Sequence, residues 1–311
     1  MEIILAEPRG FCAGVTRAID IVEKALEKFG APIYVRHEIV HNKFVVENLR
    51  QKGAIFVEEI TDIPQNSLVI FSAHGVSKKV EEDAKNKNLK IIDATCPLVS
   101  KVHREAKKYE SEDYEIILIG HKGHPEVEGT SGQVTKPVII VSDEDKARTV
   151  KIKNPEKIAY VTQTTLSVDD TKKIVQIIEE RFPSLKRGLA TKDICYATQN
   201  RQDAIRELAK KVDLILVIGA QNSSNSNRLR DLASEYVESH LINLDNEINK
   251  EWLKEKNKIG ISAGASAPEI LVKNVIERLK KMSDNPEEVK VYGMNGIKEN
   301  VYFALPRELR K

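Results

Sequence analysis

The stretch "KIIDATCPLVSKVHREA", residues 90–106, decides the fold. A short run of β-forming residues leads to Cys96, a proline follows, and apolar residues then recur at the spacing of an amphipathic helix. A strand that passes directly into a helix is the repeating element of parallel sheets. The stretch therefore predicts an α/β fold with Cys96 at the turn between strand and helix.

The same alternation continues along the whole chain. Strand patterns are "EIILA" (2–6), "LVIFSA" (68–73), "EIILIG" (115–120), "PVIIVS" (137–142), "KIAYVT" (157–162), "DLILVIGA" (213–220) and "KIGISA" (258–263). Helical patterns are "AIDIVEKALEKF" (18–29), "KKVEEDAKN" (78–86), "LVSKVHREAKKY" (98–109), "TKKIVQIIEERF" (171–182), "NRLRDLASEYV" (227–237) and "EILVKNVIERLKKM" (269–282). This order predicts mainly parallel sheets that are covered by helices on both faces.

The three cysteines repeat one local pattern. Cys12 and Cys195 also stand between an extended segment and a helix, in "EIILAEPRGFCAGVTRAIDIV" (2–22) and "TKDICYATQNRQDAIRELA" (191–209). The repetition predicts three similar α/β domains, and their expected ranges are 14–95, 96–194 and 1–13 with 195–282, followed by a tail at 283–311 that packs over them. If these domains meet around a common axis, their three thiolates share one centre.

Composition and charge exclude several classes of protein. Lysine and arginine total 49 against 47 acidic residues, and a net charge of +2 provides no basic field for nucleic acid. The apolar runs are too short to span a membrane and no basic leader precedes the first one, so we expect a cytoplasmic protein without a membrane partner. An odd number of widely spaced cysteines does not describe a disulfide framework, which leaves redox or metal chemistry.

Polar side chains gather where predicted strands pass into helices, the place at which open α/β sheets bind ligands. They are His41, His74, His124, Glu126, Gln163, Thr164, Thr165, Ser223, Ser224, Asn225 and Ser266. Hydroxyl and amide groups at a helix amino terminus can hold a phosphate together with backbone N–H groups. Such residues are also ordinary helix caps, and Ser266 with Glu269 matches a capping box.

Three thiolates at one centre leave two kinds of metal site open. An iron–sulfur cluster normally takes four thiolates, so three would leave one iron free to act as a Lewis acid. Zinc with three cysteines and a histidine is the alternative, although zinc sites normally show closely spaced cysteine pairs. The residues alone therefore allow an iron–sulfur enzyme, a zinc-dependent hydrolase of a phosphorylated small molecule with Glu126 as general base, or a non-catalytic sensor of a small anion.

The ordered set of motifs carries a family resemblance. The motifs are "GFCAGVTRA" (10–18), "VHN" (40–42), "SAHGV" (72–76), "DATCPLVSKVH" (93–103), "GHKGHPEVEGTSG" (120–132), "TQTTLS" (162–167), "DICYATQNRQDA" (193–204), "NSSNSNRL" (222–229), "SAGASAPE" (262–269) and "ENVYFALPREL" (299–309). In this order they resemble the 4-hydroxy-3-methylbut-2-enyl diphosphate reductase family, which carries out the last step of the non-mevalonate isoprenoid pathway.

The resemblance implies a cofactor and a reaction. It implies a pseudo-threefold trefoil of α/β domains around one oxygen-sensitive [4Fe–4S] cluster per chain, held by Cys12, Cys96 and Cys195 with one iron open. It also implies a two-electron reductive dehydration of an allylic diphosphate to isopentenyl and dimethylallyl diphosphate. The electrons would come from reduced ferredoxin or flavodoxin, and we expect a monomer.

The resemblance also implies roles for the polar residues. Those that match the diphosphate-binding set are His41, His74, His124, Ser223, Ser224, Asn225 and Ser266. Glu126 matches the proton-donating carboxyl, and Thr164 matches the threonine that contacts the reacting hydroxyl. His124 stands two residues from Glu126 and can relay protons, since the unperturbed imidazole pKa is near 6.5.

Overall fold

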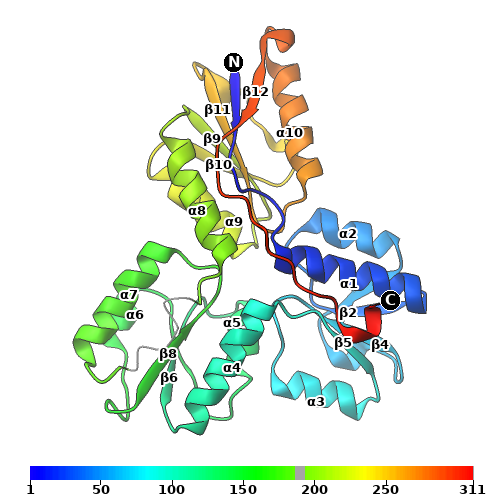
Figure 1. The fold of residues 1–311 in the computed structure, drawn as a ribbon, viewed down its shortest axis with the longest axis vertical. Coiled ribbons are helices and arrows are strands. Elements are labelled where there is room, and N and C mark those ends of the chain that lie inside the picture. Colours follow the sequence, from blue (N-terminus) through cyan, green and yellow to red (C-terminus); the bar gives the residue numbers. More distant parts are fainter. Residues whose placement is uncertain (186–192, 311) are drawn as a thin grey trace. The chain divides into compact units, whose positions relative to one another are not determined.

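The computed structural model describes residues 1–185 and 193–310, and the strands in this part of the chain form three parallel sheets (Figure 1). This confirms the predicted α/β fold with small parallel sheets. The chain divides into two compact units. Unit 1 consists of Met1–Ala13, His41–Val45 and Tyr196–Tyr302, and unit 2 consists of Gly14–Val40, Val46–Cys195 and Phe303–Lys311. The boundaries of three domains stay a prediction.

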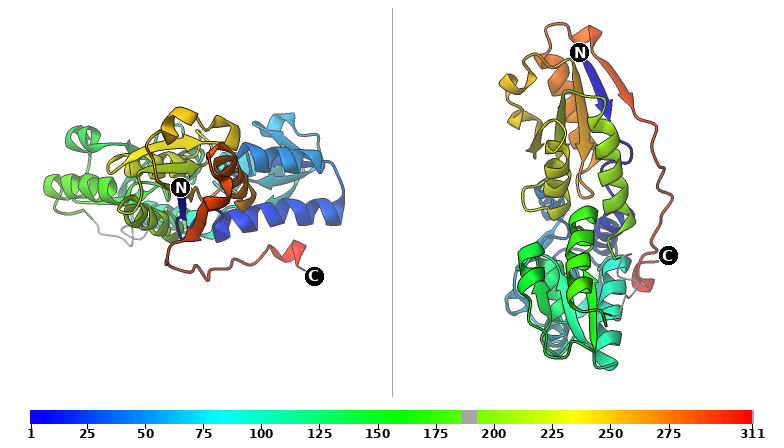
Figure 2. Two further views of the ribbon diagram at one scale, coloured as in Figure 1. Left: turned by 90° about the horizontal axis from the view of Figure 1, so that it is seen from above. Right: turned by 90° about the vertical axis from the view of Figure 1, so that its left-hand side faces the viewer.

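Unit 1 is built on one five-stranded parallel sheet. Its strands, in spatial order, are β10 (Glu238–Ile242), β9 (Leu214–Ile218), β11 (Lys258–Ala263), β1 (Glu2–Leu5) and β12 (Lys290–Gly293). Its helices are α8 (Tyr196–Ala209), α9 (Ser224–Ser234) and α10 (Glu269–Met282). Figure 2 shows β12 side by side with β1.

Both faces of this sheet are covered, as the continuous apolar strands predict. Alternate residues of β9 point to opposite faces. Leu216 belongs to the same core cluster as Val275 of α10, whereas Val217 belongs to the cluster that contains Ile205 of α8 and Leu229 of α9. Helix α10 therefore lies on one face, and α8 and α9 lie on the other.

Unit 2 contains two smaller sheets. The first has the order β3 (Ala54–Val57), β2 (Ile33–Arg36), β4 (Leu68–Phe71) and β5 (Lys90–Asp93). The second has the order β7 (Ile139–Val141), β6 (Glu115–Ile119) and β8 (Ile158–Thr162). The remaining helices are α1 (Ala13–Phe29), α2 (Lys43–Gln51), α3 (Lys78–Asn86), α4 (Pro97–Ser111), α5 (Pro125–Ser131), α6 (Glu144–Thr149) and α7 (Val168–Arg181).

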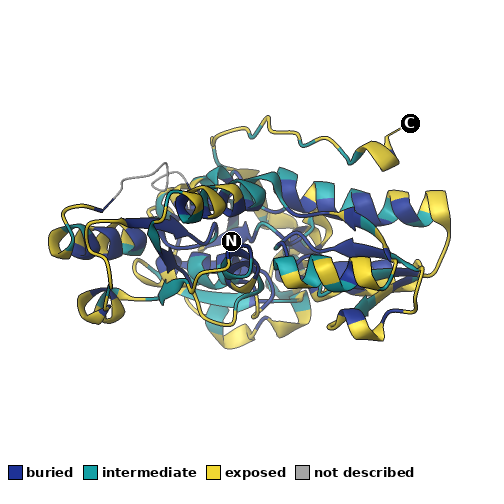
Figure 3. Cartoon of the chain, turned by 90° about the horizontal axis from the view of Figure 1, so that it is seen from below, coloured by how far each residue is buried: buried dark blue, intermediate teal, exposed yellow. Residues whose placement is uncertain are grey.

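The second sheet of unit 2 is also covered on both faces. Leu118 of β6 belongs to the same core cluster as Val102 of α4 and Val127 of α5, while Ile117 belongs to the cluster that contains Ile178 of α7. In Figure 3 much of the sheets is buried, and the outward faces of the helices are exposed. The amphipathic patterns read from the sequence thus correspond to the faces that the helices bury.

Some elements were missed by the sequence patterns. Strands β2, β3, β10 and β12 were not found; β2, β10 and β12 carry polar residues, β3 has only four residues, and β12 lies within the segment that was expected to be a tail. Of the extended segment expected before Cys195, residues 191–192 lie outside the described residues, and Asp193 and Ile194 are not part of a strand. Within residues 1–185 and 193–310, no helix is both long and apolar enough to cross a membrane.

Candidate functional site

A buried acid lies at the carboxyl ends of two neighbouring strands. Glu126 is in the first turn of α5, which follows β6, and Thr164 follows β8. Because β6 and β8 are parallel neighbours, the two residues meet at one edge of the sheet. The Thr164 backbone N–H donates to Glu126 Oε1 over 2.6 Å, and its hydroxyl donates to Oε2 over 3.0 Å.

The surroundings of Glu126 favour the protonated carboxyl. The residue is only 3% exposed. Burial raises its pKa to about 7; the hydrogen bonds from Thr164 lower it, and the nearby Asp193 carboxylate raises it. A carboxyl with this pKa can hold and release a proton near neutral pH, as a general acid must.

Two histidines extend this site. The Glu126 backbone N–H donates to Nδ1 of His124 over 3.2 Å, so His124 caps α5. The His74 and His124 rings meet edge to face with centroids 6.0 Å apart. Unit 2 therefore brings together four of the residues predicted from the sequence: His74, His124, Glu126 and Thr164.

The loop that carries His74 is tightly packed. Gly75 has a φ of +79°, which favours glycine, and a Cβ there would come within 2.6 Å of Cε1 of His103. His103 is buried, and this burial lowers its pKa to about 4. A neutral imidazole therefore supports the turn that presents His74.

A second polar group lies in unit 1, where β9 and β11 end. Ser223 caps α9 by accepting the Ser226 N–H, as the capping alternative predicted, and Ser224 and Asn225 begin the helix. Asn225 is 5% exposed, and neither atom of its amide group has a hydrogen-bond partner within the described part of the chain. A buried amide without partners is costly, and a polar ligand would satisfy it.

Ser266 does not form the capping box. Helix α10 begins at Glu269 with Pro268 at its N-cap, and no side chain caps it. The Ser266 hydroxyl instead donates to the backbone oxygen of His41 over 2.9 Å. Nδ2 of Asn222 lies 3.5 Å from Nδ1 of His41. Unit 1 thus joins His41 and Ser266, and Asn222 links His41 to the loop before α9.

Each cysteine directly precedes a helix, as the repeated pattern predicted. Cys12 precedes α1, Cys96 precedes α4 and Cys195 precedes α8, and all three are thiols rather than disulfides. Each is also held by its backbone N–H. Cys12 donates to the oxygen of Ala265, Cys96 to that of Ala73 and Cys195 to that of Thr164, over 3.2, 3.0 and 3.1 Å. Every acceptor is a predicted site residue or its immediate neighbour.

The thiols suit a soft metal group. Cys96 and Cys195 belong to unit 2 and Cys12 to unit 1. Within the described ranges, no three histidine, cysteine, aspartate or glutamate side chains are grouped to hold a metal ion. Each thiol is nevertheless partly exposed at the amino end of a helix, where negative charge is stabilised, and thiolates are the ligands that iron–sulfur clusters take.

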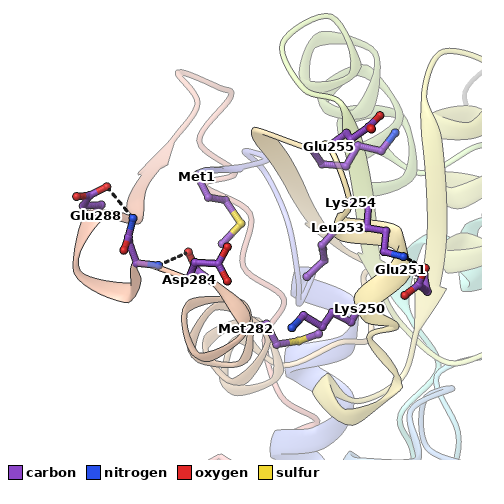
Figure 4. Close-up of a pocket in the computed structure, with 12 residues that line it drawn as sticks. Met1, Lys250, Glu251, Leu253, Lys254, Glu255, Met282, Asp284 and Glu288 are labelled. Carbon is purple, nitrogen blue, oxygen red and sulfur yellow. Dashed lines mark hydrogen bonds and ion pairs between the residues drawn. The ribbon is translucent and has the colours of Figure 1, made fainter.

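A pocket in unit 1 contains none of the predicted residues. It has a volume of about 620 Å³ and is lined by charged side chains near the amino end of β1, among them Lys250, Glu251, Lys254 and Asp284 (Figure 4). Ligand sites in parallel sheets lie at the opposite, carboxyl ends of the strands. The candidate site is therefore the polar groups at the strand ends and not this pocket.

The sequence patterns assigned no role to Asp193, although it precedes Cys195 by two residues. Its carboxylate is buried, accepts the Thr162 N–H over 3.3 Å and lies 3.0 Å from Nζ of Lys101. Burial, together with the nearby Glu105 carboxylate, raises its pKa to about 6, although Lys101 acts in the opposite direction. Only the "DIC" segment of the motif pointed to Asp193.

The fold and the side chains at its strand ends define a class of protein, an α/β protein that binds a small polar molecule where parallel strands end. Comparison with known proteins identifies the family of the chain. The chain belongs to the LytB protein family, whose model matches residues 3–280.

Relatives cover the full chain. It is 55% identical over 310 residues to 4-hydroxy-3-methylbut-2-enyl diphosphate reductase 2 of Bradyrhizobium diazoefficiens, covering 99% of each. It is also 55% identical to 4-hydroxy-3-methylbut-2-enyl diphosphate reductase of Acinetobacter baumannii, covering 100% of this chain and 98% of the relative.

Two solved structures share the fold. The E-1-hydroxy-2-methyl-but-2-enyl-4-diphosphate reductase of Plasmodium falciparum superposes with a TM-score of 0.91 at 38% identity, covering 99% of this chain and 96% of that one. A second structure, described as the terminal enzyme of the non-mevalonate pathway, gives a TM-score of 0.64 at 34% identity, covering 90% and 99%.

Proposed function

We propose that this protein reduces (E)-4-hydroxy-3-methylbut-2-enyl diphosphate, the final step of the non-mevalonate isoprenoid pathway. Two electrons and two protons are taken up, the allylic hydroxyl leaves as water, and the products are isopentenyl and dimethylallyl diphosphate. Relatives of this name that match the whole chain support the choice of substrate. The observation that carries the chemistry is the buried Glu126, whose pKa of about 7 lets it hold a proton at neutral pH.

Cys12, Cys96 and Cys195 would hold one [4Fe–4S] cluster per chain. When bound, such a cluster supplies the electrons and, at the iron without a cysteine, a Lewis acid for the hydroxyl oxygen. The three thiols and their hydrogen-bonded backbone N–H groups support this assignment.

Glu126 donates the proton that converts the leaving hydroxyl to water. An allylic hydroxyl is a poor leaving group, and general acid catalysis contributes typically 10²–10⁴-fold. The two hydrogen bonds from Thr164 orient the carboxyl and stabilise the carboxylate that remains after transfer. Since Nδ1 of His124 accepts the Glu126 N–H, the ring proton is on Nε2, from which His124 can relay a proton.

Polar side chains bind the diphosphate. They are His41, His74, His124, Ser223, Ser224, Asn225 and Ser266. The unsatisfied amide of Asn225 supplies a buried donor, and the amino end of α9 supplies N–H groups and the positive end of the helix dipole. Charge-assisted hydrogen bonds of this kind are short and strong.

The electron donor is reduced ferredoxin or flavodoxin, and the enzyme acts as a cytoplasmic monomer. The chain has neither a nucleotide-binding glycine motif nor another redox-active motif, so electrons must come from a partner. Three thiols are maintained in a reducing compartment such as the cytoplasm.

Metal and sulfide analysis tests the cofactor. Protein purified without oxygen should be brown, contain about four iron and four sulfide per chain and give an altered electron paramagnetic resonance spectrum after reduction when the diphosphate is added. A colourless protein with zinc would favour a hydrolase, and one that binds an anion without any metal would favour a sensor. Either result would overturn the proposal.

A further inference from the structure

A basic side chain follows each cysteine at nearly the same distance along the chain. They are Arg17, Lys101 and Arg201, five or six residues after Cys12, Cys96 and Cys195. Each lies on the helix that its cysteine precedes. Each contacts the chain just ahead of a different cysteine.

Arg201 holds the approach to Cys12. Its guanidinium is fully buried and donates to the backbone oxygen of Gly10 from Nε over 3.1 Å and from Nη2 over 2.8 Å. The opposite side of the fork is bound to both carboxylate oxygens of Glu299, over 3.0 and 3.2 Å. A bidentate, fully paired arginine fixes its partners strongly.

Arg17 holds the approach to Cys96. Nη1 donates to the backbone oxygen of Thr95 over 3.0 Å, and Nε donates to that of Ala304 over 2.9 Å. Thr95 is the residue directly before Cys96. The carboxyl-terminal segment therefore takes part here through Ala304, as it does at Arg201 through Glu299.

Lys101 holds the approach to Cys195. Its ammonium group lies 3.0 Å from the buried carboxylate of Asp193, two residues before Cys195, and 3.5 Å from that of Glu105. Asp193 in turn accepts the Thr162 N–H at the end of β8. The three contacts form a cycle along the sequence. The helix after Cys12 contacts the chain before Cys96, and the helix after Cys96 contacts the chain before Cys195. The helix after Cys195 contacts the chain before Cys12.

We infer that Arg17, Lys101 and Arg201 are positioning residues for the three thiols. Each fixes the main chain ahead of one cysteine, so that its sulfur stays placed for metal uptake. This role rests on the proposed function, since it takes the cysteines as cluster ligands. It also assigns a task to the carboxyl-terminal segment, which braces two of the three cations.

The pairing predicts a pattern that general destabilisation would not produce. In the metal-free full-length chain, the alkylation rate of each cysteine by iodoacetamide is measured by mass spectrometry in Arg17→Lys, Lys101→Gln and Arg201→Lys. Lysine keeps the charge but lacks the fork. We expect a rise of about tenfold for Cys96 in the first variant, for Cys195 in the second and for Cys12 in the third.

Matched controls lie on the same helices. Three control variants alter only surface ion pairs: Lys24→Gln on α1, Lys108→Gln on α4 and Arg206→Lys on α8. In each control, the alkylation rates of the three cysteines should stay within about twofold of wild type. In cluster-loaded protein, only the three positioning variants should release iron to a chelator about tenfold faster.

The inference would be overturned if the alkylation rates of all three cysteines rose equally, or if none rose, in variants whose circular dichroism spectra are native. Should Arg201→Lys fail to fold, Glu299→Gln takes its place, because it weakens the contact that braces the Arg201 guanidinium. In that variant only the alkylation rate of Cys12 must rise. If the wild-type chain took up no iron, the proposed function would be wrong. The alkylation pattern of the metal-free chain would still test whether the three basic residues position the cysteines.

Discussion

Replacing Glu126 with glutamine removes the proposed proton donor at almost constant shape. The amide oxygen can still accept the Thr164 N–H, and the amide nitrogen can face the Thr164 hydroxyl, so the fold should persist. Turnover should fall by about 10²–10⁴-fold, the usual contribution of a general acid, while substrate affinity changes little.

The same variant has a stability signature with a defined sign. The folded pKa of Glu126, about 7, is above its ordinary value of 4.5, so the folded chain binds the proton more tightly. The associated stabilisation is complete below pH 4.5 and is lost as the pH rises through about 7. This interval corresponds to about 3 kcal/mol of unfolding free energy.

Urea unfolding of metal-free protein, followed by circular dichroism between pH 4.5 and 7.5, measures this difference. The stability of wild type relative to Glu126→Gln should decline by about 3 kcal/mol over that range. The exposed Glu128 lies on the same helix and provides a control. The difference in unfolding free energy between wild type and Glu128→Gln should stay constant over this pH range. A flat difference for Glu126→Gln would refute a raised pKa, and full turnover by the variant would remove Glu126 from the proton path.

Three further changes test other parts of the account. Cys195→Ser should lose the cluster, and a full complement of iron and sulfide in that variant would contradict its role as a ligand. Asn225→Ala should weaken diphosphate binding by about tenfold or more while the empty protein keeps or gains stability, because a buried unsatisfied amide disappears; calorimetric titration showing an unchanged dissociation constant would rule out the contact. Gly129→Ala would place a Cβ 3.1 Å from the Gly75 oxygen, so thermal unfolding should show a loss of about 1–3 kcal/mol, and wild-type stability would mean that this contact is loose.

Much of the fold could be predicted from periodicity. Runs such as 214–218 are buried on both faces and read clearly as central parallel strands. Strand β12 could not be found in the same way, because the four residues of "KVYG" are all exposed and gain their structure only by pairing with β1. Edge strands of this kind depend on partners that lie far away in the chain.

The site could be predicted in part. The composition of the loops pointed to Glu126 and Thr164, but the pKa of Glu126 depends on burial and on the distant Asp193, which no local pattern encodes. Ser266 is a different case. Its spacing from Glu269 matches a capping box, but its hydroxyl donates to the backbone oxygen of His41 instead. The contacts of Arg201 with Gly10 also escape local patterns, because they join residues that are 191 positions apart in the sequence.

The most direct test of the central claim is product analysis. The cluster-loaded protein is incubated without oxygen with (E)-4-hydroxy-3-methylbut-2-enyl diphosphate and a reduced viologen dye, and the products are identified by mass spectrometry. We predict isopentenyl and dimethylallyl diphosphate, with two dye molecules oxidised for each substrate consumed. Unchanged substrate, or release of phosphate without oxidation of the dye, would contradict the account.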